Sequence, residues 1–151
     1  MKRITRLATV ALLTGAAAVT AGTQTAAADP GWCHGSEVTT CIKLEVEGNR
    51  ARAVATARDV DGGTDFGVDV RWVELQVFNR TLNKWQKLAG TYEEGYETHF
   101  DVAASGWDDC AGHGGIMQFR AAGWYKWRVA PDGSPSYDEM TTKPFGISCA
   151  P

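Results

Sequence analysis

Residues 68–78, with the sequence VDVRWVELQVF, decide the fold that this chain predicts. Apolar and polar residues alternate along the second half of the stretch, and an alternation of period two predicts a β-strand with one buried face. The phase of the alternation shifts between Val70 and Val73, so we expect a β-bulge near Arg71 and Trp72. The stretch therefore predicts one long strand with a local irregularity.

The same period dominates the chain after residue 40. Residues 50–58 are rich in alanine and would allow a helix by composition, but the turn at Gly48-Asn49 and the loop at 59–67 favour a hairpin strand. Seven short strands at regular intervals predict an all-β fold, an antiparallel sandwich, with a small β-barrel as the alternative. The expected strands cover residues 42–47, 50–58, 68–78, 85–92, 98–102, 117–129 and 141–149, with a glycine-rich loop at 106–115 and a turn at 131–135.

Two runs of the sequence resemble strands of a known class of domain. RWVELQV at 71–77 and QFRAAG at 118–123 are similar to the third and sixth strands of immunoglobulin-like and fibronectin type III domains. The resemblance lies in the strand pattern of residues 41–149, and it implies that these two strands are neighbours in one sheet. The second strand carries no cysteine, so the inter-sheet disulfide of antibody domains is missing.

The first 28 residues have the pattern of a secretion signal. A basic start with Lys2, Arg3 and Arg6 precedes an apolar segment and the small residues at 26–28 that signal peptidase recognises. The signal resembles those of small actinobacterial exported proteins, and its apolar run is shorter than the ~20 residues that a membrane span needs. We expect a secreted, extracellular protein without a membrane anchor, divided into a cleaved signal at 1–28, an N-terminal segment at 29–40 and a sandwich domain at 41–151.

All four cysteines follow the signal, and an even number outside the cell indicates disulfides rather than free thiols. Four cysteines allow three pairings, and their spacing alone does not choose among them. The immunoglobulin-like order that the resemblance implies brings Cys110, before the sixth strand, near Cys149 at the end of the last strand. Cys33 and Cys41 both lie at the start of the first strand. The expected disulfides are therefore Cys33–Cys41 and Cys110–Cys149.

The charge balance argues against nucleic acid as a partner. Lys2, Arg3 and Arg6 leave with the signal, so 12 of the 15 Lys and Arg remain against 18 Asp and Glu. Binding to a phosphate backbone depends on positive charge, which this balance does not provide.

No catalytic signature is present in the sequence. His34, His99 and His113 stand in no recognisable pattern, and the nucleophile-elbow, zinc-protease, Walker and dinucleotide motifs are absent. The adjacent acids Glu93-Glu94 and Asp108-Asp109 are typical of solvated loops rather than of facing glycosidase carboxylates. Because a Ser-His-Asp triad is recognised by geometry rather than by order, a small secreted hydrolase with an unrecognised active site stays the alternative function.

Calcium is the one cofactor that the sequence brings into consideration. The segment DVDGGTD at 59–65 places Asp59, Asp61 and Asp65 around two glycines, and such acids can wrap a hard cation. Glycine at the fourth and fifth positions and the lack of a Glu at the twelfth depart from the EF-hand pattern. A turn rich in Asp and Gly explains the same residues, and no other cofactor is expected.

Aromatic residues give the strongest indication of a functional surface. One face of the sixth strand is apolar enough to be the core face, which leaves Trp124 outside with Arg120 and Lys126. On the third strand Trp72 and Phe78 point outwards if the alternating valines and leucine point inwards. An exposed patch of aromatic and basic residues suits protein or sugar partners. The alternative is that these rings lie in the core or are covered by long side chains.

The sequence therefore predicts a secreted, non-enzymatic binding domain, expected to be a monomer. Its partner would be an extracellular protein, including an enzyme that it inhibits, or a cell-surface polysaccharide. A second candidate surface is the end of the sandwich that carries the loops 59–67, 90–97 and 130–140, which is expected to be acidic. The candidate binding residues are Trp72, Phe78, Arg120, Trp124 and Lys126.

Overall fold

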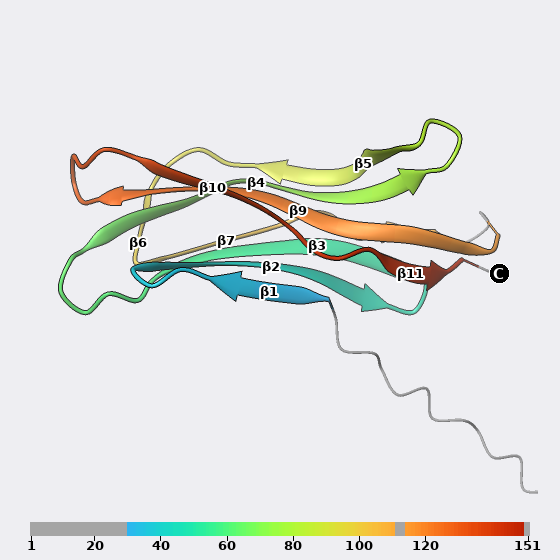
Figure 1. The fold of residues 1–151 in the computed structure, drawn as a ribbon, viewed down its shortest axis with the longest axis horizontal. Helices are drawn as coiled ribbons and strands as arrows, with labels where there is room; N and C mark the ends of the chain where they lie inside the picture. The colour runs from blue at the N-terminus through green and yellow to red at the C-terminus, as the bar shows by residue number, and fades with distance from the viewer. Residues whose placement is uncertain (1–29, 111–113, 150–151) are drawn as a thin grey trace, which may run out of the picture.

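The computed structural model describes residues 30–110 and 114–149, so the expected signal at 1–28 and His113 lie outside the described residues (Figure 1). All regular structure in these two ranges is β-strand, as the alternating pattern predicts. The strands are β1 (Gly31–His34), β2 (Val38–Glu47), β3 (Arg50–Asp59), β4 (Phe66–Asn79), β5 (Lys84–Tyr92), β6 (Glu97–Thr98), β7 (Phe100–Ala104), β8 (Asp108–Asp109), β9 (Ile116–Val129), β10 (Ser136–Thr141) and β11 (Phe145–Ser148).

Two antiparallel sheets pack face to face, so the fold is a β-sandwich rather than a barrel (Figure 1). Sheet A has the strand order β1-β2-β3-β7, and β8 also pairs with β3. Sheet B has the order β10-β9-β4-β5, with β11 paired to β9 and β6 paired to β4. The long strands β4 and β9 are neighbours, as an immunoglobulin-like order requires.

The structure has eleven strands within the described ranges, whereas the sequence predicts seven. Three of the additional strands, β1, β6 and β8, are only two to four residues long. Segments this short contain too few positions to show an alternation, and they become strands because a neighbouring long strand supplies their hydrogen bonds. The first of them, Gly31–His34, joins the edge of sheet A beside β2.

The expected last strand begins earlier and is interrupted. It begins at Ser136 rather than Thr141, and β10 and β11 pair with successive parts of β9. Between them lies Pro144, which has no N–H to donate to a ladder. The hydroxyl of Thr142 accepts the N–H of Ala121 at 3.0 Å, so a side chain replaces part of the missing ladder.

The hydrophobic core lies between the sheets and follows the predicted faces of the two long strands. Leu75 of β4 and Phe119 of β9 are fully buried, and the alternate residues beside them are buried as well. The alanines of β3 fill the facing positions on sheet A, so the stretch 50–58 is a strand and not a helix. Tyr125 is also fully buried, and its hydroxyl donates to the carbonyl of Cys41 at 2.6 Å, which links the two sheets.

Both expected disulfides are present. Cys33–Cys41 joins β1 to β2 at directly opposite positions, and its Cα atoms lie 4.1 Å apart. Cys110–Cys149 joins the segment after β8 to the residue after β11, and both of its cysteines are buried.

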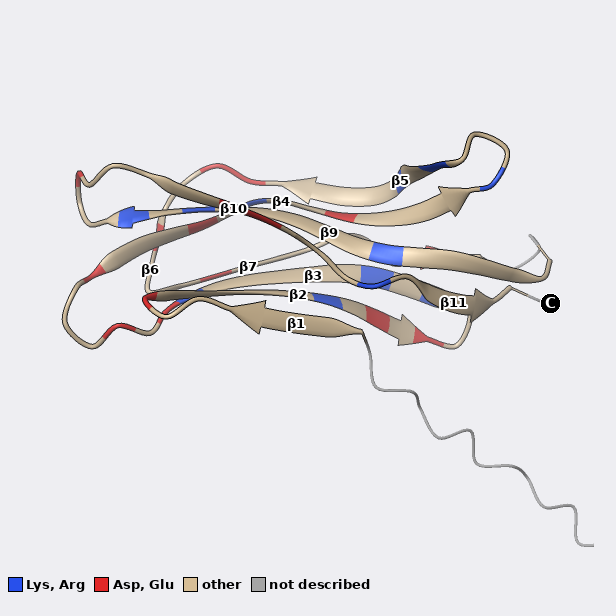
Figure 2. Ribbon diagram, in the orientation of Figure 1, with Lys and Arg blue, Asp and Glu red and all other residues tan. Residues whose placement is uncertain are grey.

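Acidic residues gather at the end of the sandwich that carries the predicted loops, on the left of Figure 2. The loops are tied together there: the N–H of Ala130 donates to the carbonyl of Asp65 at 2.8 Å. The carbonyl of Glu37, in the turn between β1 and β2, accepts the N–H groups of Val60 and Asp61. These contacts join the predicted loops 59–67 and 130–140 to their neighbours at this end of the sandwich.

Candidate functional site

The five predicted binding residues all lie on the outer face of sheet B. The register of β4 against β9 shifts between Val70 and Trp72, which confirms the expected β-bulge. After the bulge Trp72 lies directly opposite Trp124 of β9. Phe78 lies opposite Trp85 of β5 at the far end of the strand. The side chains of all five residues are half-buried rather than fully exposed or in the core.

A stack of four side chains crosses this face from one edge of the sheet to the other. Tyr137 of β10 stacks on Trp124 of β9, with ring centroids 5.4 Å apart and planes only 11° apart. The guanidinium of Arg71 lies 5.9 Å from the Trp124 ring and 5.1 Å from the ring of Tyr92 on β5. Because β9 lies between β10 and β4, Trp124 is covered from both sides. Tyr137 and Tyr92 end the stack and are 54% and 63% exposed.

Arg71 is held in this stack by an ion pair and a buried carboxylate. Its Nη2 donates to Glu94 Oε1 at 2.9 Å and to the hydroxyl of Tyr92 at 2.5 Å. Its Nη1 lies 3.7 Å from Asp69 Oδ2. Within the described part of the chain, neither Asp69 Oδ2 nor Arg71 Nε has a hydrogen-bond partner. Burial raises the pKa of Asp69 to about 6, and the nearby charge of Arg71 offsets only part of this effect.

The other cations of the outer face also contact aromatic rings. The guanidinium of Arg120 lies 4.4 Å from the ring of Trp85, and its Nε donates to Gln76 Oε1 at 2.8 Å. Lys126 and Arg128 lie 4.8 Å and 4.3 Å from the ring of Tyr96. A cation placed over a ring in this way is attracted by the negative face of the ring.

We call this surface the aromatic–cation face. It combines aromatic rings and basic groups from β4, β5, β9 and β10 and from the loop between β5 and β6. Its members are Arg71, Trp72, Phe78, Trp85, Tyr92, Tyr96, Arg120, Trp124, Lys126, Arg128 and Tyr137.

Sequence reasoning missed two contributors to the stack, Arg71 and Tyr92, and placed Tyr137 only at the acidic end. The signal for Arg71 was available, because a β-bulge puts two consecutive residues on one side of a strand and the phase shift marks that position. Tyr92 and Tyr137 reach the stack through the pairing registers of β5 and β10, which alternation does not reveal.

The predicted metal residues are only partly brought together. Asp59 and Asp65 lie with His99 in a group whose ligand atoms are within 4.8 Å of one another, and Asp61 is not part of it. The Asp59 carboxylate accepts the N–H groups of Asp61 at 3.2 Å and Phe66 at 3.1 Å, and His99 Nδ1 lies 3.1 Å from it. Burial alone would raise the pKa of Asp59. The hydrogen bonds together lower it by more than burial raises it, so the pKa of Asp59 lies below its ordinary value.

The hydrogen bonds of this loop are those of an Asp-rich turn. Asp61 Oδ1 likewise accepts the N–H of Gly63 at 3.3 Å. Two carboxylates and one imidazole are fewer donors than the six to eight oxygens that calcium takes. Calcium binding by Asp59, Asp61 and Asp65 stays a prediction.

Two histidines form pairs with carboxylates. His34 Nε2 lies 2.6 Å from Asp138 Oδ2, which also accepts the hydroxyl of Thr40 at 3.0 Å. His99 pairs with Asp59 as described above. A hydrolytic triad needs a hydroxyl or thiol on the second nitrogen of the imidazole, and no such hydrogen bond exists within the described residues. Within the described ranges these two histidines therefore form no Ser-His-Asp triad, and the alternative hydrolase stays a prediction.

Within the described ranges, no helix is long and apolar enough to cross a membrane. The chain was compared with protein-family models, with curated proteins and with solved structures, and none of the three comparisons gives a match.

Proposed function

We infer that this chain is a secreted, non-enzymatic domain that binds an extracellular protein through its aromatic–cation face. The observation that carries the proposal is the stack of Tyr137, Trp124, Arg71 and Tyr92, which ends in an exposed tyrosine at each edge of the sheet. Tyrosine, tryptophan and arginine are the residues most enriched at the energetic centres of protein interfaces.

The stack favours a protein over a polysaccharide as the partner. A sugar ring packs its apolar side flat against an aromatic face, but the central ring of the stack, Trp124, lies between Tyr137 and Arg71, so that only the two terminal tyrosines offer exposed rings. Ring edges, tyrosine hydroxyls and the margins of the guanidinium groups stay available, and they suit the mixed polar and apolar surface of a protein.

Pre-organisation supports the same conclusion. Ordering a long side chain at an interface costs about 0.5–1.5 kcal/mol. The Arg71 side chain is only 13% exposed and is fixed by Glu94, Tyr92 and Asp69 before any partner arrives. Arg71 therefore loses little side-chain freedom on binding.

The test uses oxidised protein without its signal, immobilised and exposed separately to extracellular proteins and to cell-wall polysaccharide. Variants Tyr137→Ala and Tyr92→Ala remove the two ends of the stack. Phe100→Ala is the matched control, because Phe100 is a ring of similar exposure, 50%, on β7 of sheet A. A parallel sample with a calcium chelator tests the loop at 59–65.

We expect retention of a discrete protein that both stack variants weaken by about tenfold or more and that Phe100→Ala preserves. The retained protein is then titrated against each variant to measure the change in Kd. Equal losses in all three variants, or retention of polysaccharide alone, would contradict the proposal. Retention lost only with the chelator would move the site to Asp59, Asp61 and Asp65.

A further inference from the structure

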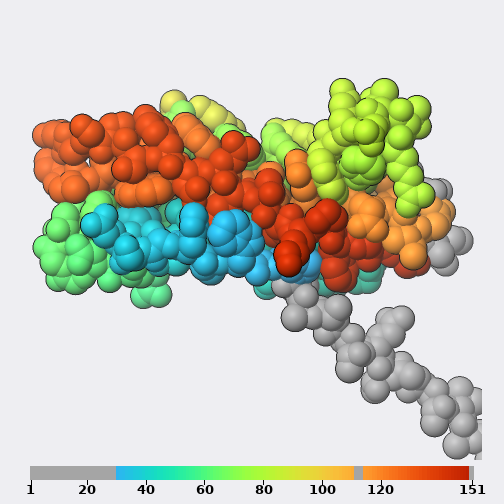
Figure 3. All heavy atoms as spheres, viewed as in Figure 1, coloured from blue at the N-terminus to red at the C-terminus, as the bar shows by residue number. Residues whose placement is uncertain are grey.

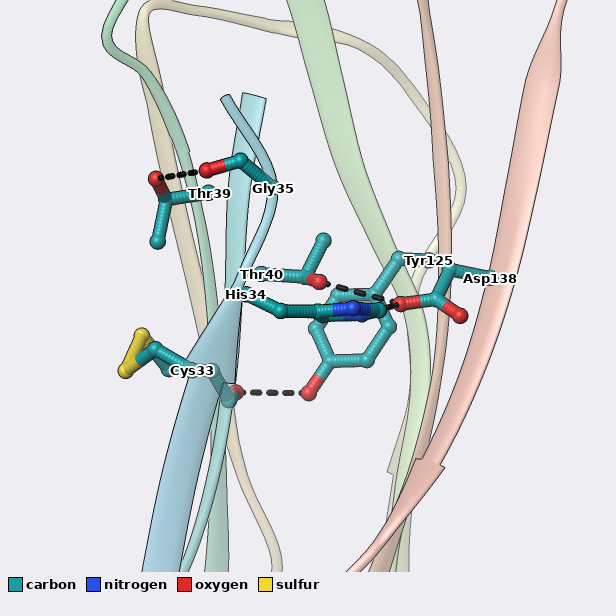
Figure 4. Close-up of a disulfide and its surroundings, with 8 residues drawn as sticks. Cys33, His34, Gly35, Thr39, Thr40, Tyr125 and Asp138 are labelled. Carbon is teal, nitrogen blue, oxygen red and sulfur yellow. Dashed lines mark hydrogen bonds and ion pairs between the residues drawn. A yellow bond between two sulfur atoms is a disulfide. The ribbon is translucent and has the colours of Figure 1, made fainter. Parts of the chain in front are cut away.

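The two disulfides of this domain differ sharply in their surroundings. Cys110 and Cys149 are 2% and 0% exposed. Cys33, by contrast, is exposed and lies on the edge strand β1, in which every residue is exposed. Figure 4 shows the sulfur atoms on the outer side of β1, while His34 points inwards to Asp138 on β10. The Cys33–Cys41 bond is therefore the one of the two that solutes can reach without unfolding.

A groove lies directly beside this bond. It has a volume of about 360 Å³, and its wall includes both sulfur-bearing residues together with Trp32, Lys43 and Val54. A groove of this size holds a small molecule next to the disulfide. Thiol–disulfide exchange proceeds through attack by a thiolate, and its rate depends on access to a sulfur, which the groove and the exposure of Cys33 provide.

We propose that Cys33–Cys41 is a modification site, at which low-molecular-weight thiols exchange with the disulfide of the folded protein. The thiolate attacks Sγ of Cys33 and forms a new sulfur–sulfur bond with it. The Cys33–Cys41 bond breaks, and its electron pair leaves on Sγ of Cys41, which then takes a proton from water. A second thiolate attacks the small thiol's sulfur in the mixed disulfide. The bond to Cys33 breaks and its electron pair leaves on Sγ of Cys33, which takes a proton from water, so both cysteines end as thiols and the two small thiols as their disulfide.

The exchange acts on a strand that fastens the two sheets together. The indole N–H of Trp32 donates to the carbonyl of Thr141 at 2.9 Å, and His34 pairs with Asp138. Both partners belong to β10 of sheet B, and Figure 3 shows β1, in blue, against this part of the chain at the surface. Opening the disulfide removes the covalent bond that joins β1 to β2, and leaves β1 held by hydrogen bonds and side-chain contacts. The Cys110–Cys149 bond joins other segments, the one after β8 and the residue after β11.

The modification site does not rest on the proposed function, although the two are connected. Tyr137, the residue immediately before Asp138 on β10, stacks on Trp124 and forms one end of the stack. If β1 detaches from β10, Asp138 loses its contact with His34, and the neighbouring Tyr137 at one end of the aromatic–cation face is held less firmly.

The experiment treats the folded, oxidised protein with increasing concentrations of glutathione, traps thiols with N-ethylmaleimide and maps the cysteine-containing peptides by mass spectrometry. We expect glutathione on Cys33, with Cys41 trapped as a free thiol, at a concentration about tenfold or more below that which opens Cys110–Cys149. Hydrogen exchange on the same samples should rise in β1 and stay unchanged in β9.

The same titration in guanidinium chloride is the control, and there we expect the two disulfides to react at similar concentrations. Opening of both disulfides together in the folded protein, or of Cys110–Cys149 first, would overturn the proposal. Glutathione found on Cys41 instead of Cys33 would overturn the assignment of the attacked sulfur. The double variant Cys110→Ser/Cys149→Ser, if it folds, must still form the mixed disulfide at Cys33.

Discussion

The carboxylate of Asp69 lies 3.7 Å from the guanidinium of Arg71, and Asp69 is only 2% exposed although it belongs to the outer face of sheet B. The loop after β5 covers it, with Glu94 bound to the same arginine. Lys126 lies opposite Asp69 on β9, and Asp101 of β7 adds a second negative charge nearby. A charged group is thus enclosed directly beneath the stack of aromatic rings.

The enclosure predicts how stability changes with pH. Burial raises the pKa of Asp69 from 3.8 to about 6, so between these values the folded protein holds a proton that the unfolded chain has released. The contribution of Asp69 to stability therefore falls as the pH rises from about 4 to 6. An Asp69→Asn variant cannot titrate there, so its stability relative to the wild type should increase across this range by about 3 kcal/mol.

Urea denaturation of both proteins at pH 4, 5, 6 and 7.5 measures this difference. Phe100→Ala, which removes an exposed ring from sheet A without changing any charge, is the control for general effects of pH. A constant difference between Asp69→Asn and the wild type would show that the carboxyl is not enclosed as described.

Removing the other partner should have the opposite effect. Arg71→Met leaves Asp69 buried without its nearest cation, and we expect a loss of about 3 kcal/mol at neutral pH. In Asp69→Asn/Arg71→Met the buried carboxylate is gone, and Glu94, which also loses its partner, is exposed to solvent, so most of that loss should be recovered. Urea unfolding of the four proteins gives the coupling energy between the two residues. Strictly additive effects would mean that the two side chains do not interact.

A third prediction concerns the hydrogen bond between the sheets. Tyr125→Phe removes the hydroxyl that donates to the Cys41 carbonyl, and leaves that carbonyl without this partner, at a cost of about 1 kcal/mol. Burial raises the pKa of Tyr125 above its ordinary value of 10.0, so the folded protein keeps the phenol proton where the unfolded chain loses it. The wild type should therefore lose stability above about pH 10, and its advantage over Tyr125→Phe should shrink there. Thermal unfolding of both proteins at pH 7.5 and about pH 11 tests this; an advantage that grows would contradict it.

Two glycines that both have a positive φ should respond differently to substitution. Gly35, in the turn before β2, has a φ of +106°, and a Cβ there would lie 1.9 Å from the Val38 carbonyl oxygen. Gly48 has a φ of +63° and nothing within 4 Å of such a Cβ. We expect Gly48→Ala to cost about 1 kcal/mol, because only the left-handed conformation is penalised. Gly35→Ala must also move backbone and should cost more than about 2 kcal/mol. Denaturant midpoints compare the two, and equal losses would contradict the close approach at Gly35.

Alternation along β4 and β9 carried most of what the sequence could predict. It assigned Leu75 and Phe119 to the core and Trp72 and Trp124 to the outer face, and its phase shift located the bulge. The expected topology in turn gave the disulfide pairing. These features depend on the alternation within a single strand or on the expected order of the strands, and both can be read from the sequence.

What the sequence could not show depends on contacts between strands. The pairing of Tyr137 with Lys126 sets which ring reaches Trp124, and no local pattern fixes that register. The enclosure of Asp69 results from a loop that returns over β4, so the residue resembles an ordinary solvated acid until the fold exists. The four residues of β1 become a strand only because β2 lies beside them.

The break at Pro144 has a consequence for contacts between molecules. A long, regular edge strand offers unpaired N–H and carbonyl groups to any extended chain, and this is how many β-proteins aggregate. Here β10 and β11 divide one edge of sheet B, and β5 with the two residues of β6 forms the other, with an irregularity near Leu75 of the partner strand. The edges of sheet A are the four residues of β1 on one side and the short strands β7 and β8 on the other. Among the described residues, these edges are broken into short or irregular pieces, which gives an extended chain little regular backbone to pair with.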